Sequence, residues 1–154
     1  MGFGLAHRRR GGGVELHLEE VHRTILRDVL GQLREALVAD TDDPVLARLF
    51  PPAYADDEEK EEGFRALARD ELLEHRLEAI DTVESSLDDT TLSPDTADAW
   101  VRALNALRLV LGTRLDVRED DERRVDEDHP DAPAWILYEL LSALVDDLVG
   151  ALEP

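Results

Sequence analysis

Histidines and glutamates about one helical turn apart are the residues with the clearest potential for chemistry. Glu19-Glu-Val-His22 has the Glu-x-x-His spacing, which helical di-iron proteins repeat on two paired helices. In Glu71-Leu-Leu-Glu-His75 the histidine follows the first glutamate by four residues, so the pattern is not repeated. His17 and His22 lie five residues apart, whereas a helical zinc pair lies four apart. We therefore expect no metal ion and no cofactor.

His22 itself falls on the apolar face predicted for the first helix, between the directions of Val29 and Leu33. A single histidine on such a face is usually neutral and hydrogen-bonded inside the core. We interpret His22 in this way and keep a ligand-binding role as the alternative.

Three arginines lie within the apolar arcs of later helices. They are Arg76, Arg108 and Arg114. A guanidinium group cannot be buried alone at acceptable cost, and its planar fork suits a carboxylate. We therefore expect Arg108 and Arg114 each to pair with an Asp or Glu from another element, which would fix the register of their helix. Binding of an anion or of a partner protein is the alternative for all three.

Several chemistries are excluded because the chain has no cysteine. Disulfides, thiolate catalysis, zinc–sulfur sites and thiol redox switching all require that residue. The three glycines at 11–13 do not follow a buried strand as a phosphate-binding loop would, and no Gly-x-Ser-x-Gly nucleophile elbow occurs. We therefore expect a protein that is not an enzyme.

The formal net charge of −20 over 154 residues is the most unusual bulk property. Such a surface repels nucleic acid and anionic membranes. It is explained either by solubility or by recognition of a basic protein. The most apolar stretch, 135–152, contains three acidic residues and does not fit a membrane span, and the first residues do not form a signal peptide. We expect a cytoplasmic protein.

Helical periodicity dominates the chain. We predict an all-α, single-domain bundle over 14–154, preceded by a flexible arm at 1–13. The main helices are expected at 19–39, 58–87, 94–116 and 134–152, with a short helix at 44–50. Segments 14–18 and 90–92 are expected to pair as a two-stranded ribbon. Arg23, Arg27 and Arg34 lie opposite the apolar stripe of the first helix and are expected to face solvent.

Turn and cap residues mark the helix boundaries. Ser93-Pro94 is suited to the cap and first position of the helix that follows, and Asp56-Asp57 offers a cap for the helix from 58. Residues 116–132 are rich in Asp and Glu but lack the glycine and ligand spacing of a calcium loop, so we expect a solvated loop.

The helix from Trp100 to Leu115 carries the string Asn105-x-x-Arg108 followed by Gly112-Thr-Arg114-Leu115. With Leu49-Phe-Pro-Pro-Ala-Tyr54 and the acidic pair after it, this string resembles an actinobacterial family of all-helical proteins. The family is catalogued as a domain of unknown function and as the AosR oxidative-stress regulator family. The resemblance covers about residues 14–152, and Asn105, Arg108 and Arg114 mark its signature helix.

The resemblance implies a regulator without established catalytic residues. In the role proposed for the family, a cysteine pair senses oxidation and the protein then engages a sigma factor. This chain has no cysteine, so thiol sensing does not carry over. We expect a non-enzymatic regulatory protein with a protein partner, and self-association is left open. One alternative is an enzyme or small-molecule binder with Arg108, Arg114 or His22 pointing into a bundle cavity. The other is an adaptor in regulated proteolysis, because the family's genes commonly neighbour the ClpS adaptor.

Overall fold

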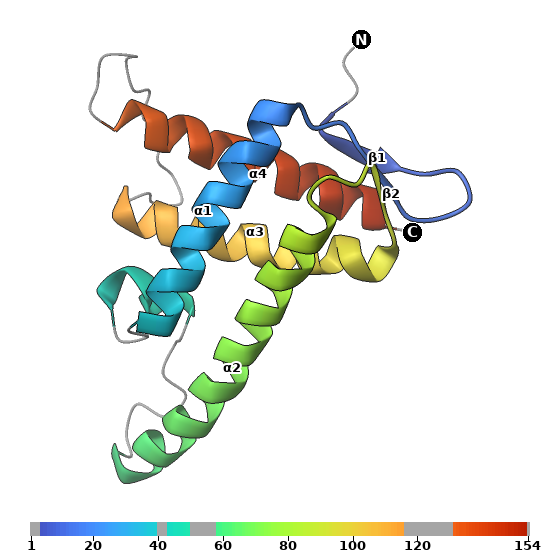
Figure 1. The fold of residues 1–154 in the computed structure, drawn as a ribbon. Helices are drawn as coiled ribbons and strands as arrows, with labels where there is room; N and C mark the ends of the chain where they lie inside the picture. Colours follow the sequence, from blue (N-terminus) through green and yellow to red (C-terminus); the bar gives the residue numbers. More distant parts are fainter. Residues whose placement is uncertain (1–3, 40–42, 50–57, 116–130, 154) are drawn as a thin grey trace.

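The computed structural model describes residues 4–39, 43–49, 58–115 and 131–153 (Figure 1). Four α-helices account for most of them, and three short strands form a small sheet. In chain order the elements are β1 (Ala6–Arg8), β2 (Val14–Leu16), α1 (Glu20–Ala39), the 3-10 helix η1 (Pro44–Leu49), α2 (Glu58–Ser86), β3 (Thr91–Leu92), α3 (Pro94–Arg114) and α4 (Ala132–Leu152). The predicted all-α bundle of four main helices and one short helix is confirmed.

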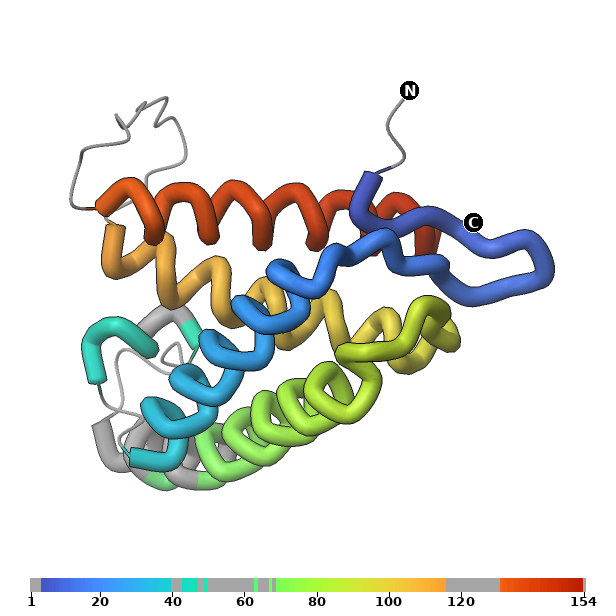
Figure 2. The backbone as a smooth tube through the Cα atoms, turned by 45° about the horizontal axis from the view of Figure 1, so that its top comes forward, coloured from blue at the N-terminus to red at the C-terminus, as the bar shows by residue number. Residues whose placement is uncertain are grey.

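α3 is the central helix. It packs against α4, α2 and η1, and Figure 2 shows it between α4 and α2. Its buried residues face several directions, as the wide apolar arc predicted, and the fully buried Trp100 is the largest of them. The predicted cap is confirmed, because Ser93 Oγ accepts a hydrogen bond of 3.1 Å from the Thr96 N–H and Pro94 holds the first position.

The sheet has one more strand than predicted. β2 pairs antiparallel with β3, as expected, and β1 adds to the other side of β2, with Ala6 opposite Leu16 and Arg8 opposite Val14. The segment expected to be a flexible arm therefore contains a strand. Gly11, Gly12 and Gly13 close the hairpin, all three with positive φ angles that glycine adopts without strain.

The hairpin is fastened to the C-terminal part of α4. The Leu5 N–H donates to Asp147 Oδ2 at 2.7 Å, and the Arg8 guanidinium donates to the carbonyl oxygen of Glu153. Ala6 is buried on this side of the sheet. These long-range contacts give β1 a fixed place, and no local sequence pattern announces them.

α2 is buried along only part of its length. Ala79, Ile80 and Val83 in its C-terminal half are buried, as is Leu87 just beyond it, whereas Leu67 is 71% exposed. Between these two regions Leu72, Leu73 and Leu77 are half-buried against the core. The predicted cap at Asp56-Asp57 and residues 116–130 of the acidic loop predicted at 116–132 lie outside the described residues, and Ala132 already belongs to α4. Among the helices of the described residues, none is long and apolar enough to cross a membrane.

Candidate functional site

The signature residues Asn105 and Arg108 of α3 contact each other. Arg108 Nη2 donates to Asn105 Oδ1 at 2.7 Å, one turn earlier on the same helix, and both side chains are half-buried. Within the described part of the chain, Arg108 has no carboxylate partner. Among the described residues the expected ion pair to another element is not formed, and Arg108 bonds within α3 instead. An amide oxygen accepts from guanidinium without having to bury a second charge.

Arg114 is exposed, contrary to the prediction that it points into the core. It forms no hydrogen bond or ion pair with residues that the structure describes. It lines a cavity of about 150 Å³ between α1, η1, α3 and α4, whose walls include Leu107, Leu111 and Leu141. Position 114 lies in the last turn of α3, where a long side chain leaves the bundle easily. Neither Arg108 nor His22 lines this cavity.

His22 lies in the first turn of α1 and not in the core. Its side chain is half-buried, and its Nδ1 accepts a hydrogen bond of 3.2 Å from the Glu19 N–H. The N–H groups of a first helical turn have no partners within the helix, so His22 satisfies one of them. The hydrogen-bonded interpretation is confirmed and the core position is wrong.

Arg23 takes the place in the core that was expected of His22. It is buried on the face that it shares with Leu26, Leu30, Leu33 and Leu37. Its position three residues before Leu26 and seven before Leu30 is a helical repeat that could have revealed it. Arg23 was expected to face solvent because the centre of the apolar stripe was predicted at the wrong angle around the helix axis.

The guanidinium of Arg23 reaches the C-terminal end of α2. Its Nη1 donates to the carbonyl oxygen of Leu87 and, at 3.2 Å, to that of Asp89. Carbonyl groups just past a helix have no donors within the helix, and a cation is favourable there. Arg23 thus ties the start of α1 to the end of α2 without a carboxylate.

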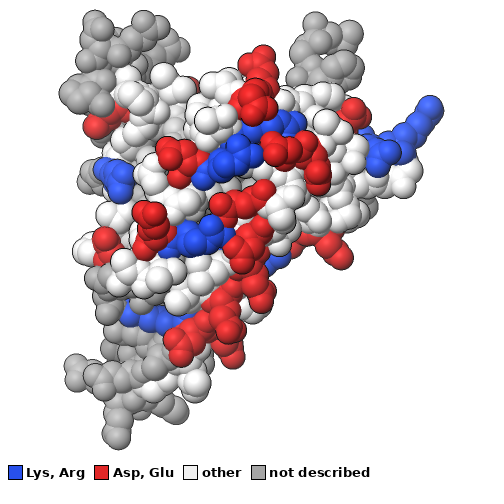
Figure 3. Space-filling view, in the orientation of Figure 1, with Lys and Arg blue, Asp and Glu red and all other residues white. Residues whose placement is uncertain are grey.

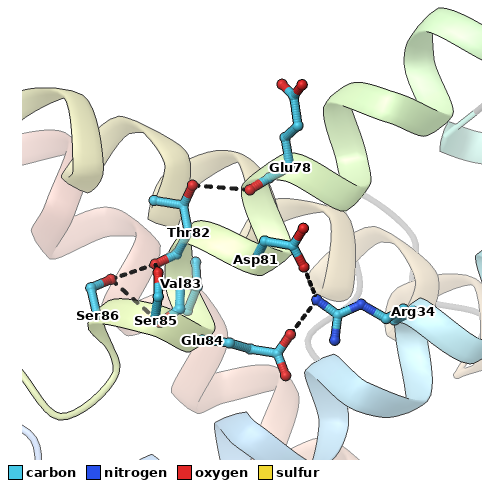
Figure 4. Close-up of polar contacts among 8 residues, drawn as sticks. All are labelled: Arg34, Glu78, Asp81, Thr82, Val83, Glu84, Ser85 and Ser86. Atoms are coloured by element: carbon cyan, nitrogen blue, oxygen red, sulfur yellow. Dashed lines mark hydrogen bonds and ion pairs between the residues drawn. The ribbon is translucent and has the colours of Figure 1, made fainter.

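Arg34 forms ion pairs across the same two helices, although it was expected simply to face solvent. Its Nη2 contacts carboxylate oxygens of both Asp81 and Glu84 on α2 (Figure 4). The hydrogen bond to Glu84 raises the pKa of Arg34 above the ordinary arginine value, and the charges of Glu84 and Asp81 add to it against the opposing effect of burial. A raised base pKa contributes stability below the ordinary value, so this contribution is constant near neutral pH and is lost only in strong alkali.

Ser86 in the last turn of α2 joins this helix to α3. The Trp100 Nε1–H donates to Ser86 Oγ at 2.8 Å, and that hydroxyl donates in turn to the Thr82 carbonyl oxygen at 2.7 Å. Figure 4 shows the bond from Ser86 to Thr82 on the same helix as Asp81 and Glu84, which pair with Arg34. A buried indole N–H requires a partner, and Ser86 supplies it.

Arg76 lies in a second cavity, of about 430 Å³, between α2 and α3. The cavity is lined by Glu71, Leu72, His75, Arg76, Ala79 and Arg102. Among the described residues, the buried Arg76 Nε has no hydrogen-bond partner. Burial, and then the charge of Arg102, lower the pKa of Arg76. Arg102 forms an ion pair with Asp98 at 3.1 Å. The described residues therefore do not form the buried ion pair expected for Arg76. The alternative given above, binding of an anion, remains.

A cluster of His7, Glu15 and His17 lies on the hairpin, where the sequence predicted no site. His7 and His17 stack with ring centroids 4.6 Å apart, and His7 Nε2 lies 3.3 Å from Glu15 Oε2. The sequence feature that could have revealed this cluster is the alternation of Glu15 and His17 along a strand. It was missed because His7 had been assigned to a flexible arm. The predicted residues Arg76, Arg114 and His22 lie at separate places, and only Asn105 and Arg108 come together.

Comparison with known proteins places the whole described chain in one family. The family model of a domain of unknown function, DUF2017, matches residues 5–152. The putative oxidative stress regulator AosR of Mycobacterium leprae is 30% identical over 128 residues, which cover 72% of this chain and 59% of that protein. The oxidative stress regulator AosR of Mycobacterium tuberculosis is 31% identical over 124 residues, which cover 70% of this chain and 57% of that protein.

The same values hold for the oxidative stress regulator AosR of Mycobacterium bovis. The chain thus spans less than two thirds of the length of these relatives. No solved structure matches it. The match over residues 5–152 and the identity of the relatives lead to one conclusion: this chain belongs to the DUF2017 family, together with proteins named AosR.

Proposed function

We propose that this chain is a non-enzymatic regulator of the oxidative-stress response that acts by binding a protein partner in the cytoplasm. The observation that carries the proposal is its relationship to proteins named oxidative stress regulators. The sequence adds support, because it has neither a phosphate-binding loop after a strand nor a nucleophile elbow. A sigma factor is the partner that the family resemblance suggests.

The charge of the molecule supports a basic partner. Asp70, Glu74, Glu78 and Asp81 are exposed on α2 at spacings of four, four and three residues, which place them on one face. We call these four residues the acidic ridge. Figure 3 shows acidic side chains gathered along α2. Together with the net charge of −20, the ridge favours a basic protein surface over nucleic acid or an anionic membrane.

Regulation by this chain does not depend on its own thiols, because it has no cysteine. We therefore propose that partner binding is constitutive, and that the stimulus acts on the partner or on the amount of this protein. When only this chain is treated with peroxide or with dithiothreitol, and the reagent is removed, its binding to the untreated partner should be the same. A change of more than about threefold in the dissociation constant, which is about 0.7 kcal/mol, would contradict this mechanism.

The test combines a gene deletion in the native host with charge variants of the protein. Deletion should change peroxide survival and the transcripts induced by peroxide, and the wild-type gene should restore both. The double variant Glu74→Lys/Glu78→Lys should fail to restore them and should lose its partner in a pull-down. Deletion without effect on survival or on transcripts would refute the regulatory role.

A matched control separates the acidic ridge from charge in general. Glu139→Lys/Asp146→Lys changes the net charge by the same amount at exposed positions of α4. We expect this variant to keep the partner and to complement the deletion. Equal loss in both variants would show that total charge, and not the ridge, governs binding. A protease component as the retained partner would favour the adaptor role instead.

Small-molecule binding is a second candidate, favoured by the cavity beside Arg114. Its lining is mostly apolar, with Gln32, Asp43 and Arg114 as the polar residues, and the Arg114 guanidinium suits the carboxylate of a small aromatic acid. Titration of benzoate into the labelled protein should then shift amide signals of α3 and α4, and Arg114→Leu should abolish the shifts. Unchanged signals at millimolar benzoate would eliminate this candidate.

A further inference from the structure

The hairpin formed by β1 and β2 places three potential metal ligands on one face. His7 is directly opposite Glu15 in the antiparallel register, and His17 follows Glu15 by two residues. Side chains two residues apart in an extended chain point to the same side. The alternate positions Ala6, Val14 and Leu16 are buried against the core, so the face with the two histidines is turned outward.

The ligand atoms of these side chains are already close together. One ligand atom from each of His7, Glu15 and His17 lies within 4.8 Å of the others. His17 Nε2 is 2.7 Å from His7 Nδ1, and His7 Nε2 is 3.3 Å from Glu15 Oε2. Zinc–nitrogen bonds of about 2.0–2.1 Å at a tetrahedral angle separate two nitrogens by about 3.3 Å. The contacts to His17 and Glu15 use different nitrogens of His7, and an ion binds only one of them. The His7 ring therefore has to turn, and the imidazoles have to separate by a few tenths of an ångström, to admit an ion.

We propose that His7, Glu15 and His17 form a binding site for one transition-metal ion of the Zn²⁺ class. Two imidazoles and one carboxylate suit Zn²⁺, Cu²⁺ or Ni²⁺, whereas Mg²⁺ and Ca²⁺ require more oxygen ligands. Three protein ligands leave a fourth position for water or for a ligand from a partner protein. This site is independent of the acidic ridge and goes beyond the proposed function.

A bound ion would connect β1 to β2 through side chains, in addition to the backbone hydrogen bonds of the strands. β1 is in turn fastened to α4 through the bond from Leu5 to Asp147 and through Arg8. Metal binding would therefore stabilise the attachment of the hairpin to the bundle. Slower amide exchange in β1 and β2 on addition of Zn²⁺ is a direct measure of this effect.

The experiment is calorimetric titration of Zn²⁺ into the full chain, freed of any purification tag and of metal. We expect one saturable site. His7→Gln, Glu15→Gln and His17→Gln should each weaken binding by at least about tenfold, since even residues behind the ligands typically matter by 10–100-fold. A hundredfold excess of Mg²⁺ should not displace the ion. In NMR spectra, only the ring signals of His7 and His17 should shift among the five histidines.

His75→Gln is the matched control, because His75 is exposed on α2 and outside the cluster. It should bind Zn²⁺ like the wild type. Amide spectra of each variant check that the hairpin is still formed. Absence of saturable binding would overturn the proposal. So would unchanged binding by His17→Gln, or several weak sites that disappear with added salt, which would indicate diffuse attraction to the acidic surface.

Discussion

Two parts of α2, before Ala79 and from Ala79 onward, are held in the fold in different ways. From Ala79 onward the helix buries apolar side chains, receives Arg34 from α1 and joins Trp100 through Ser86. From Leu67 to Glu78 the described side chains are exposed or half-buried, and Arg76 has a buried nitrogen without a partner among the described residues. The part from Ala79 onward is thus held by fully buried apolar side chains and by side-chain bonds to α1 and α3, whereas the described apolar side chains between Leu67 and Glu78 are at most half-buried.

This difference indicates which part of α2 has side chains available for binding a partner. Polar groups in the C-terminal half of α2 are largely engaged in holding the fold, as Ser86 and Glu84 show. Three of the four residues of the acidic ridge, and Arg76 with most residues of its cavity, lie before Ala79 or on α3. Elements that bind partners are commonly drawn from the less stable parts of a domain.

The largest effect is expected at the buried tryptophan. Trp100→Ala removes a fully buried indole and its bond to Ser86, so it should lower the free energy of unfolding by about 3–5 kcal/mol. Urea denaturation followed by circular dichroism measures the change. Leu67→Ala in the exposed half is the control and should change stability by no more than about 0.5 kcal/mol. Similar losses in the two variants would refute the contrast between the halves.

A smaller loss is expected at Arg23. Arg23→Met keeps much of the apolar stem but leaves the carbonyl oxygens of Leu87 and Asp89 without this donor, at a cost of about 1–3 kcal/mol. Arg27→Met removes an exposed pair with Asp88 at 3.2 Å and should cost about 0–1 kcal/mol. Thermal and urea unfolding of both variants give the comparison. If Arg23→Met and Arg27→Met were equally stable, solvent would replace the Arg23 guanidinium at no cost in free energy, and the prediction would be wrong.

The smallest effect, and the opposite sign, is expected at Arg76. Its pKa is lowered by burial and by Arg102, so its charged form is less favourable in the folded protein than in the unfolded chain. This cost applies at every pH below the ordinary arginine pKa. Arg76→Met should therefore leave the melting temperature unchanged or raise it. A loss of more than about 1 kcal/mol would show that Arg76 has a stabilising partner.

Much of the fold could be predicted from the sequence because its signals are local. Ser93-Pro94 marks the start of α3, and the apolar repeats define the helices to within about two residues. β1 was missed because it is held by pairing with β2 across the hairpin and by contacts with α4, which is remote in the sequence. A three-residue strand of Ala, His and Arg, followed by two more arginines and three glycines, has no local strand signal.

The candidate sites were predicted less well, because they depend on which way a helix is turned. The buried face of α1 is rotated about the helix axis relative to the predicted one. As a result His22 and Arg23 exchange environments, and Arg34 lies next to Glu84. The Asn105–Arg108 contact could have been predicted from the sequence, because residues three apart on a helix lie next to each other on its surface. The pairing of His7 with Glu15 required the register of two strands, which the sequence pattern did not provide.

The three glycines of the hairpin also determine where this chain tolerates added sequence. A β-carbon at Gly11 or Gly12 would meet nothing within 4 Å, whereas one at Gly13 would lie 2.5 Å from the carbonyl oxygen of Leu92. A peptide epitope or fluorescent tag inserted between Gly11 and Gly12 would therefore project into open space. A side chain placed on Gly13 would instead collide with Leu92, where β2 meets β3. The hairpin tip is thus a natural grafting point for reporters, far from the acidic ridge of α2.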